Sequence, residues 1–220
     1  MSAVHVLLDL VYPSRCIVCR ELMGPEPPGI CPACLAAMPA PEEPKRRVEF
    51  VDRKLYLFSY TGKYRDAMLR YKFGRRQLYG FALGRLLGAR IQSELAGQYD
   101  LISWVPLHPL RKLRRGFDQS RLLAKAAGKV LGLRPQLTLR KVRNTLRQSS
   151  MPTASARRAN ISGAYRVVHP EQFRGKRILL IDDILTTGST VSEAARTLLT
   201  AGAAKVHCAA PALTPKNRSR

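Results

Sequence analysis

From residue 100 onward, short apolar runs alternate with amphipathic stretches. Residues 99–107 (YDLISWVPL), 176–183 (KRILLIDD) and 204–213 (AKVHCAAPAL) are mostly apolar, which is typical of strands buried on both faces. Residues 118–132 and 190–202, which follow the first two runs, have the apolar spacing of amphipathic helices. This alternation predicts an α/β fold with a mainly parallel sheet flanked by helices.

The segment before residue 100 predicts one further strand, over residues 54–60 (KLYLFSY), and helices over residues 63–73 and 78–95. In the first helix Tyr64 and Met68 share a face. Its cations, Lys63, Arg65, Arg70 and Lys72, remain available to solvent or to an anion. The second helix contains three glycines, each of which costs about 1 kcal/mol relative to alanine and disfavours a regular helix.

The chain of 220 residues is long enough for one main domain and one small module. Three prolines and a burst of charge in residues 35–54 place the boundary near residue 50. We therefore expect a module over residues 1–50 and a domain over residues 51–220. Within the domain, residues 51–99 form a leading segment and residues 100–220 the α/β core.

No stretch approaches the roughly 18 uninterrupted apolar residues of a membrane helix. The apolar N-terminus lacks a basic leading region and contains Asp9, which favours a short amphipathic helix over a signal peptide. These features predict a soluble, cytoplasmic protein.

Four cysteines form two C-x-x-C pairs, Cys16 with Cys19 and Cys31 with Cys34. Two such pairs that converge on one ion provide the tetrahedral thiolate site that Zn²⁺ prefers. Two disulfides or a redox-active pair are the alternatives, but nothing in the sequence suggests export, and a redox motif normally occurs once. We expect a structural zinc ion, because four sulfur ligands leave no position for a substrate. The fifth cysteine, Cys208, is expected to be buried in a strand.

The chain carries a formal charge of +23 at pH 7, and its basic residues occur in bursts such as residues 70–76, 111–115 and 140–143. This surplus predicts an anionic partner that contains phosphate. Rings beside the bursts provide the mixture of cations and stacking surfaces that suits single-stranded nucleic acid, although helical spacing also fits a role in the core. These rings belong to Tyr64, Tyr71, Phe73, Tyr79 and Phe117.

Residues 178–190 (ILLIDDILTTGST) place two acids and a turn rich in hydroxyl groups after a strand. Thr190 and Glu193 have the spacing of a capping box, which predicts a helix that begins near Thr190. A helix N-terminus after a glycine-containing turn is a ready phosphate site. The chain lacks a P-loop motif and a Rossmann motif.

The acidic pair, Asp182 and Asp183, must bind a different chemical group from the phosphate that the turn would bind. A carboxylate about 4 Å from a phosphate is repelled by about 4 kcal/mol at an effective dielectric constant of 20. Sugar hydroxyls, or Mg²⁺ carried by a polyphosphate, would replace this repulsion with attraction. A ribose phosphate therefore satisfies both parts of the motif.

This motif resembles the phosphoribosyl pyrophosphate (PRPP) signature of type I phosphoribosyltransferases over all thirteen residues. With residues 105–120 (VPLHPLRKLRRGFDQS), residues 147–165 (RQSSMPTASARRANISGAY) and the two C-x-x-C pairs, nearly the whole chain is similar to the ComF competence family. One departure is Asp118, where that family usually has asparagine, so that a hydrogen-bond donor is lost.

The resemblance implies a zinc-ribbon module on a type I phosphoribosyltransferase-like domain. It implies that Asp182 and Asp183 hold the ribose as the catalytic acids, and that the turn binds the 5′-phosphate. Residues 105–118 would be the pyrophosphate loop, and the arginine-rich residues 140–160 are a natural lid, or else a disordered connector. The turn comprises Thr186, Thr187, Gly188, Ser189 and Thr190, and the cations of the pyrophosphate loop are Arg111, Lys112, Arg114 and Arg115.

Three functions remain open at this point. The resemblance implies association with natural transformation, in which single-stranded DNA is handled in the cytoplasm, and a DNA-uptake helicase or membrane channel would be a fitting partner. The protein could bind PRPP with Mg²⁺ and transfer the phosphoribosyl group, or serve as a DNA-binding adaptor that retains a phosphate site. A salvage enzyme for purines or pyrimidines would need a base-reading pocket, whose residues the sequence does not identify.

Overall fold

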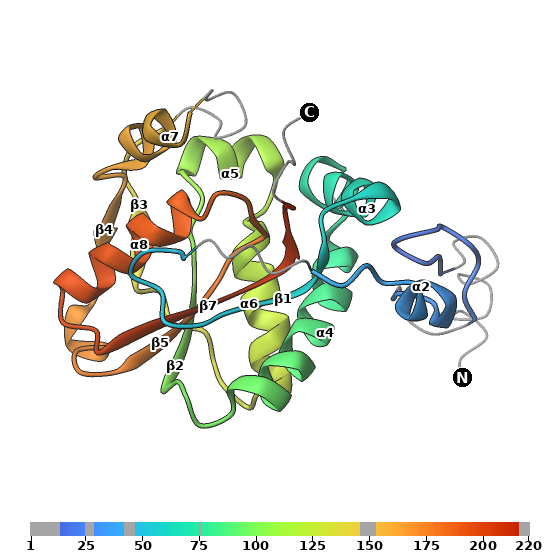
Figure 1. The fold of residues 1–220 in the computed structure, drawn as a ribbon, viewed down its shortest axis with the longest axis horizontal. Coiled ribbons are helices and arrows are strands. Elements are labelled where there is room, and N and C mark those ends of the chain that lie inside the picture. Colours follow the sequence, from blue (N-terminus) through green and yellow to red (C-terminus); the bar gives the residue numbers. More distant parts are fainter. Residues whose placement is uncertain (1–13, 25–28, 42–46, 75, 146–152, 216–220) are drawn as a thin grey trace.

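The computed structural model describes residues 14–24, 29–41, 47–74, 76–145 and 153–215 (Figure 1). Its centre is a five-stranded parallel sheet in the order β1-β7-β5-β2, with the short β6 also paired to β7. The predicted α/β class with a mainly parallel sheet is therefore confirmed. The strands are β1 (Lys54–Ser59), β2 (Leu101–Trp104), β5 (Arg177–Ile181), β6 (Ile184–Leu185) and β7 (Lys205–Leu213).

Helices cover both faces of this sheet because successive strand residues point to opposite sides. In β5, Leu179 and Ile181 pack with the helices of one face, and Ile178 and Leu180 pack with those of the other. The first layer contains α3 (Gly62–Phe73), α4 (Gln77–Leu95) and α6 (Gln119–Val130), and the second contains α8 (Ser189–Thr200). Cys208 is buried in β7, as predicted.

The three glycines of α4 allow this helix to pack closely against α6. A Cβ atom at Gly84 would lie 2.5 Å from Ala126 Cβ, and one at Gly88 would lie 2.9 Å from Val130 Cβ. Side chains at these positions would push the helices apart. The regular 19-residue helix thus forms in spite of its glycines because their small size is used in packing.

Smaller elements lie around the central sheet. They are α5 (Pro109–Arg115), the antiparallel pair β3 (Leu139–Lys141) and β4 (Tyr165–Val167), α7 (Ala154–Ile161) and a 3₁₀ turn (Pro170–Gln172) that leads into the amino end of β5. The expected lid at residues 140–160 thus contains part of β3 and most of α7, while residues 146–152 lie outside the described residues.

The cysteine module contains α2 (Pro32–Ala36) and a β-bridge between Arg15 and Leu22. The amphipathic helix expected near the N-terminus falls on residues 1–13, which lie outside the described residues. The boundary near residue 50 stays a prediction. Among the helices that the structure describes, none has the length and apolar character needed to cross a bilayer.

Candidate functional site

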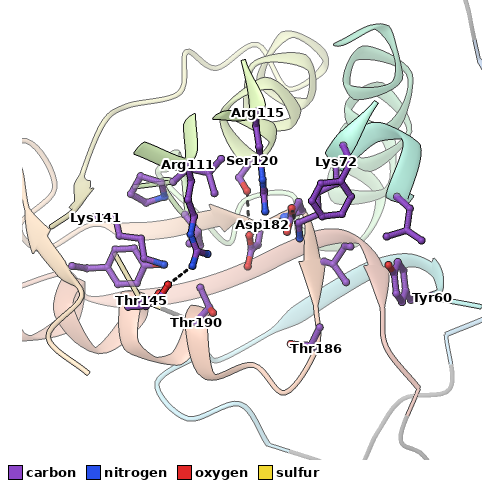
Figure 2. Close-up of a pocket in the computed structure, with 18 of the residues that line it drawn as sticks. Tyr60, Lys72, Arg111, Arg115, Ser120, Lys141, Thr145, Asp182, Thr186 and Thr190 are labelled. Atoms are coloured by element: carbon purple, nitrogen blue, oxygen red, sulfur yellow. Dashed lines mark hydrogen bonds and ion pairs between the residues drawn. The ribbon is translucent and has the colours of Figure 1, made fainter. Parts of the chain in front are cut away.

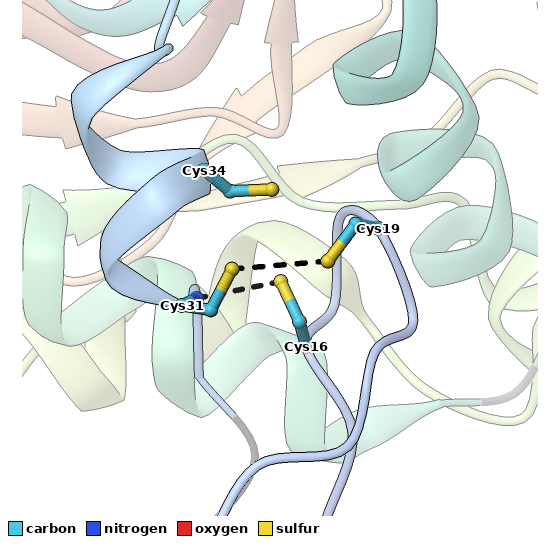
Figure 3. A group of neighbouring side chains, drawn as sticks. All are labelled: Cys16, Cys19, Cys31 and Cys34. Atoms are coloured by element: carbon cyan, nitrogen blue, oxygen red, sulfur yellow. Dashed lines mark hydrogen bonds between the residues drawn. The ribbon is translucent and has the colours of Figure 1, made fainter.

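The four paired cysteines form a compact cluster (Figure 3). Their sulfur atoms all lie within 4.8 Å of one another, and the sulfurs of Cys19 and Cys31 are 3.7 Å apart. Zn–S bonds of about 2.3 Å in a tetrahedron place two sulfurs about 3.8 Å apart, whereas a disulfide needs about 2.05 Å. The geometry therefore fits a zinc ion, and all four cysteines are free thiols.

Backbone groups favour the thiolate form of Cys16. Burial tends to raise its pKa, but hydrogen bonds from backbone N–H groups, including that of Cys31 at 3.4 Å, lower the pKa of Cys16 to about 6. Metal binding requires this deprotonated form. With four sulfur ligands, the module suits a structural zinc ion.

A pocket of about 470 Å³ lies where β2 and β5 end (Figure 2). This is the edge at which ligands bind in open parallel sheets, and the volume is in the range of small-molecule sites. Its polar lining includes both predicted acids, the threonines at the two ends of the predicted phosphate turn and several cations. These residues are Asp182, Asp183, Thr186, Thr190, Arg111, Arg115, Lys72 and Lys141.

The two acids are buried and have different partners. Asp182 Oδ1 accepts hydrogen bonds from the Ser120 hydroxyl at 3.1 Å and from the Asp183 backbone N–H at 2.8 Å. Asp183 Oδ2 forms an ion pair with Lys72 Nζ at 2.9 Å. Both side chains come directly after β5, so the strand fixes their position.

These surroundings separate the pKa values of the two acids. Burial, together with the charge of Asp183, raises the pKa of Asp182 to about 7. Burial would also raise the pKa of Asp183, but Lys72 and then Arg115 lower it. At neutral pH the pair therefore holds its negative charge mainly on Asp183.

The predicted pyrophosphate cations divide between two faces of α5. Arg111 and Arg115, four residues apart, point into the pocket, and Arg111 donates a hydrogen bond to the Thr145 carbonyl (Figure 2). Lys112 and Arg114 are exposed and do not line the pocket. The 3.6-residue period of the helix therefore directs two of these cations to the pocket and the other two to solvent.

Lys141 was not singled out as a site residue by the sequence. It comes from β3, lies beside Arg111 in Figure 2, and its Nζ is 5.4 Å from the centre of the Tyr165 ring. Burial, followed by the charge of Arg111, lowers the pKa of Lys141 to about 8. In the sequence, residues 139–141 read Leu-Arg-Lys, and nothing in this short run distinguishes Lys141 from the neighbouring cations; its burial becomes apparent only in the structure.

The turn between β6 and α8 has the conformation expected of an anion-binding loop. Gly188 has a φ of 80°, and the Thr187 and Ser189 hydroxyls lie 2.9 Å apart. A Cβ on Gly188 would lie 2.7 Å from Val48 Cγ2, so glycine is needed for space as well as conformation. The turn presents the first backbone N–H groups of α8 near the pocket.

The predicted helix start near Thr190 is confirmed to within one residue, but the predicted capping box is wrong. The helix begins at Ser189, with Gly188 as its N-cap, and that cap makes no side-chain hydrogen bond. Glu193 instead accepts a hydrogen bond from the Gly163 N–H at 2.8 Å and pairs with Arg196. The acid therefore links α8 to the segment before β4, a tertiary contact that overrides the local motif.

Asp118 stands at the N-cap of α6 and uses both carboxylate oxygens. One accepts from the Arg121 N–H at 3.1 Å and the other from the Leu107 N–H at 3.2 Å. Both of these contacts use an oxygen of Asp118 as the acceptor. The side-chain N–H donor that an asparagine would supply is needed for neither of them. The residue ties the loop after β2 to the start of α6.

The aromatic residues beside the basic bursts are mostly core residues. Tyr64, Tyr71 and Tyr79 are buried, as the alternative based on helical spacing proposed, whereas Phe73 is 56% exposed. Phe73 lines the pocket and lies 5.5 Å from the Arg115 guanidinium. One wall of the pocket is thereby apolar and aromatic, formed by Tyr60, Leu69, Phe73 and Ile184.

Comparisons with known proteins agree with both parts of the fold. Residues 7–45 match the double zinc ribbon domain family and residues 120–220 match the phosphoribosyl transferase domain family. DNA utilization protein YhgH of Salmonella typhi is 33% identical over 90% of this chain and 96% of its own length.

Two competence proteins are also similar. Competence protein F of Haemophilus influenzae is 33% identical over 46% of this chain and 45% of its own length. Competence protein ComFC of Streptococcus pneumoniae is 32% identical over 68% of this chain and 63% of its own length. The chain therefore belongs to the ComF family, in which a zinc ribbon is joined to a phosphoribosyltransferase-like domain.

Proposed function

We propose that the pocket binds PRPP or a related ribose phosphate together with Mg²⁺. One observation carries the proposal: the acidic pair, the threonines at both ends of the phosphate turn and two inward-facing arginines line a single cavity. Asp182 and Asp183 would accept hydrogen bonds from the ribose hydroxyls. The turn from Thr186 to Thr190 would hold the 5′-phosphate, and Arg111 and Arg115 would face the pyrophosphate.

The pocket also supplies oxygen atoms of the kind that Mg²⁺ prefers, from the carboxylates of Asp182 and Asp183 and from the threonines that line it, Thr145, Thr186 and Thr190. Phosphate oxygens of the ligand would complete the coordination, since Asp183 is already paired with Lys72. When bound, the ion would partly neutralise the negative charge of the leaving pyrophosphate.

If the site is catalytic, the reaction is displacement of pyrophosphate from the anomeric carbon by a nitrogen nucleophile. This chain would contribute position and charge: the carboxylates orient the ribose, and Arg111, Arg115 and Lys141 stabilise the departing anion. A salvage-type acceptor would lie along the aromatic wall, where Tyr60 and Phe73 offer ring surfaces.

Calorimetric titration of the zinc-loaded protein with PRPP and Mg²⁺ tests the proposal. We expect micromolar binding that the double substitution Asp182→Asn, Asp183→Asn abolishes while zinc content and fold are kept. The pair Arg111→Ala, Arg115→Ala should weaken binding strongly, and the matched exposed pair Lys112→Ala, Arg114→Ala should not. Retained binding in the acid variant would defeat this assignment.

We also propose that the protein handles single-stranded DNA in the cytoplasm, as a competence protein. The charge of +23 and the exposed Lys112 and Arg114 support this role, and relatives carry the names competence protein and DNA utilization protein. Affinity for a short single strand should fall steeply with salt, and Lys112→Ala, Arg114→Ala should flatten the slope. An unchanged slope would remove α5 from the DNA surface.

A further inference from the structure

Helix α3 contacts the cysteine module on one side. Arg70 donates hydrogen bonds from Nη2 to the carbonyls of Ile17 and Val18, at 2.9 and 3.0 Å, inside the first C-x-x-C pair. The Tyr64 hydroxyl donates to the Cys34 carbonyl at 2.6 Å, in the second pair. One helix therefore holds both halves of the metal cluster.

The same helix forms part of the pocket on its other side. Leu69, Lys72 and Phe73 line the cavity, and Lys72 makes the 2.9 Å ion pair with Asp183. At 3.6 residues per turn, Arg70 and Lys72 point to nearly opposite sides of the helix. Figure 1 shows α3 between the cysteine module and the rest of the domain.

The Lys72 ion pair matters because the acids are adjacent and buried. Asp182 and Asp183 are 7% and 9% exposed, so two negative charges there would repel each other with little screening by water. Lys72 offsets this repulsion at Asp183. Asp183 can then stay ionised and accept a hydrogen bond from a sugar hydroxyl.

We propose that α3 is a strut through which the cysteine module positions Lys72 against Asp183, so that the metal cluster sets the affinity of the pocket. Lys72 is a positioning residue, which acts through Asp183. The proposal rests on the ribose phosphate site proposed above. It assigns the zinc ribbon a role in the function of the domain in addition to its own folding.

A double-mutant cycle on PRPP affinity tests the strut. We expect Lys72→Met to weaken binding of PRPP with Mg²⁺ by tenfold or more, Lys72→Arg to restore most of it, and Arg70→Gln to weaken it about fivefold. Arg70→Gln should have no further effect in the Lys72→Met background, since both changes break one chain of contacts. Arg85→Gln, an exposed change on α4, is the matched control and should bind as the wild type does.

Competition for zinc with a chromogenic chelator tests the strut without any ligand. Coupling between sites is reciprocal in binding free energy, so Lys72→Met should lower zinc affinity, measured at equilibrium against the chelator, about fivefold although it lies on the pocket side, and Lys72→Arg should restore the higher affinity. Zinc affinity that is unchanged in Lys72→Met, or an Arg70→Gln effect that persists in full beside Lys72→Met, would overturn the proposal. If the wild type fails to bind PRPP, the proposed function fails while the zinc-affinity result still decides the strut.

Discussion

Replacement of Asp182 by asparagine should stabilise the protein at alkaline pH while it removes a ligand-binding acid. The side chain accepts two hydrogen bonds through Oδ1, from Ser120 and from the Asp183 N–H, and the amide oxygen of asparagine can keep both. What the variant removes is the charge. Burial and Asp183 raise the pKa of Asp182 from an ordinary 3.8 to about 7.

The sign of the pH effect follows from the protons bound in each state. Between pH 4 and pH 7 the unfolded chain has lost the Asp182 proton and the folded protein retains it, so stability falls as pH rises through this range. At about 1.4 kcal/mol per pH unit, the full penalty above pH 7 is about 4 kcal/mol. The neutral amide of the Asp182→Asn variant carries no such penalty. The free energy of unfolding of the variant should exceed that of the wild type by about 2–4 kcal/mol at pH 8, and the difference should vanish near pH 4.

Urea unfolding followed by circular dichroism, run in parallel on wild type and Asp182→Asn from pH 5 to pH 8, measures this difference. Asp66→Asn, which removes an exposed carboxylate paired at 3.6 Å with Arg65, is the matched control and should shift stability little at any pH. A constant difference between wild type and Asp182→Asn over this range would refute the reasoning, because the penalty must follow the titration of one buried group.

Further predictions concern the helix interface, Lys141 and the metal. Gly84→Ala should lower the free energy of unfolding by about 1–3 kcal/mol, because its Cβ would lie 2.5 Å from Ala126 Cβ, and unchanged urea unfolding would contradict this packing. Since burial lowers the pKa of Lys141 to about 8, binding of a polyphosphate should raise that pKa and take up a proton at pH 8. Calorimetry in buffers of different ionisation enthalpy should detect this uptake, and Lys141→Met should lose it. Cys34→Ser should lower zinc content below one ion per chain after dialysis against a chelator, measured by atomic emission, and zinc content and affinity equal to those of the wild type would exclude Cys34 as a ligand.

The fold could be predicted well because its signals are local. Apolar runs bounded by charged or turn residues marked the sheet strands β1, β2, β5 and β7, and the spacing of C-x-x-C pairs marked the metal cluster. The glycines of α4 weakened the sequence signal for that helix. They are needed because α6 packs directly against them, a tertiary contact that the local sequence does not reveal. The capping box failed for the same kind of reason, since Glu193 has a better partner in Gly163, thirty residues away.

The candidate site could be predicted in its acids and turn but only partly in its cations. The sequence alone does not distinguish the four cations in residues 111–115. Only the position of each residue around the axis of α5 separates Arg111 and Arg115, which line the pocket, from the exposed Lys112 and Arg114. Lys72 and Lys141 reach the pocket from elements distant in sequence from the motif. A single sequence carries no signal for such long-range convergence.

The division of cations on α5 has a consequence for how two anionic ligands would share the protein. Arg111 and Arg115 line a cavity with the acidic pair, whereas Lys112 and Arg114 face solvent from the same seven-residue helix. A ribose phosphate in the pocket would therefore leave the outer cations accessible to a nucleic acid backbone. It would also lower the positive charge next to that backbone by several units, and at partly exposed sites such a change weakens binding without excluding it. PRPP should accordingly reduce the affinity of a single strand modestly and in a salt-dependent manner. Complete competition at all salt concentrations would instead mean that a phosphate of the strand enters the pocket itself.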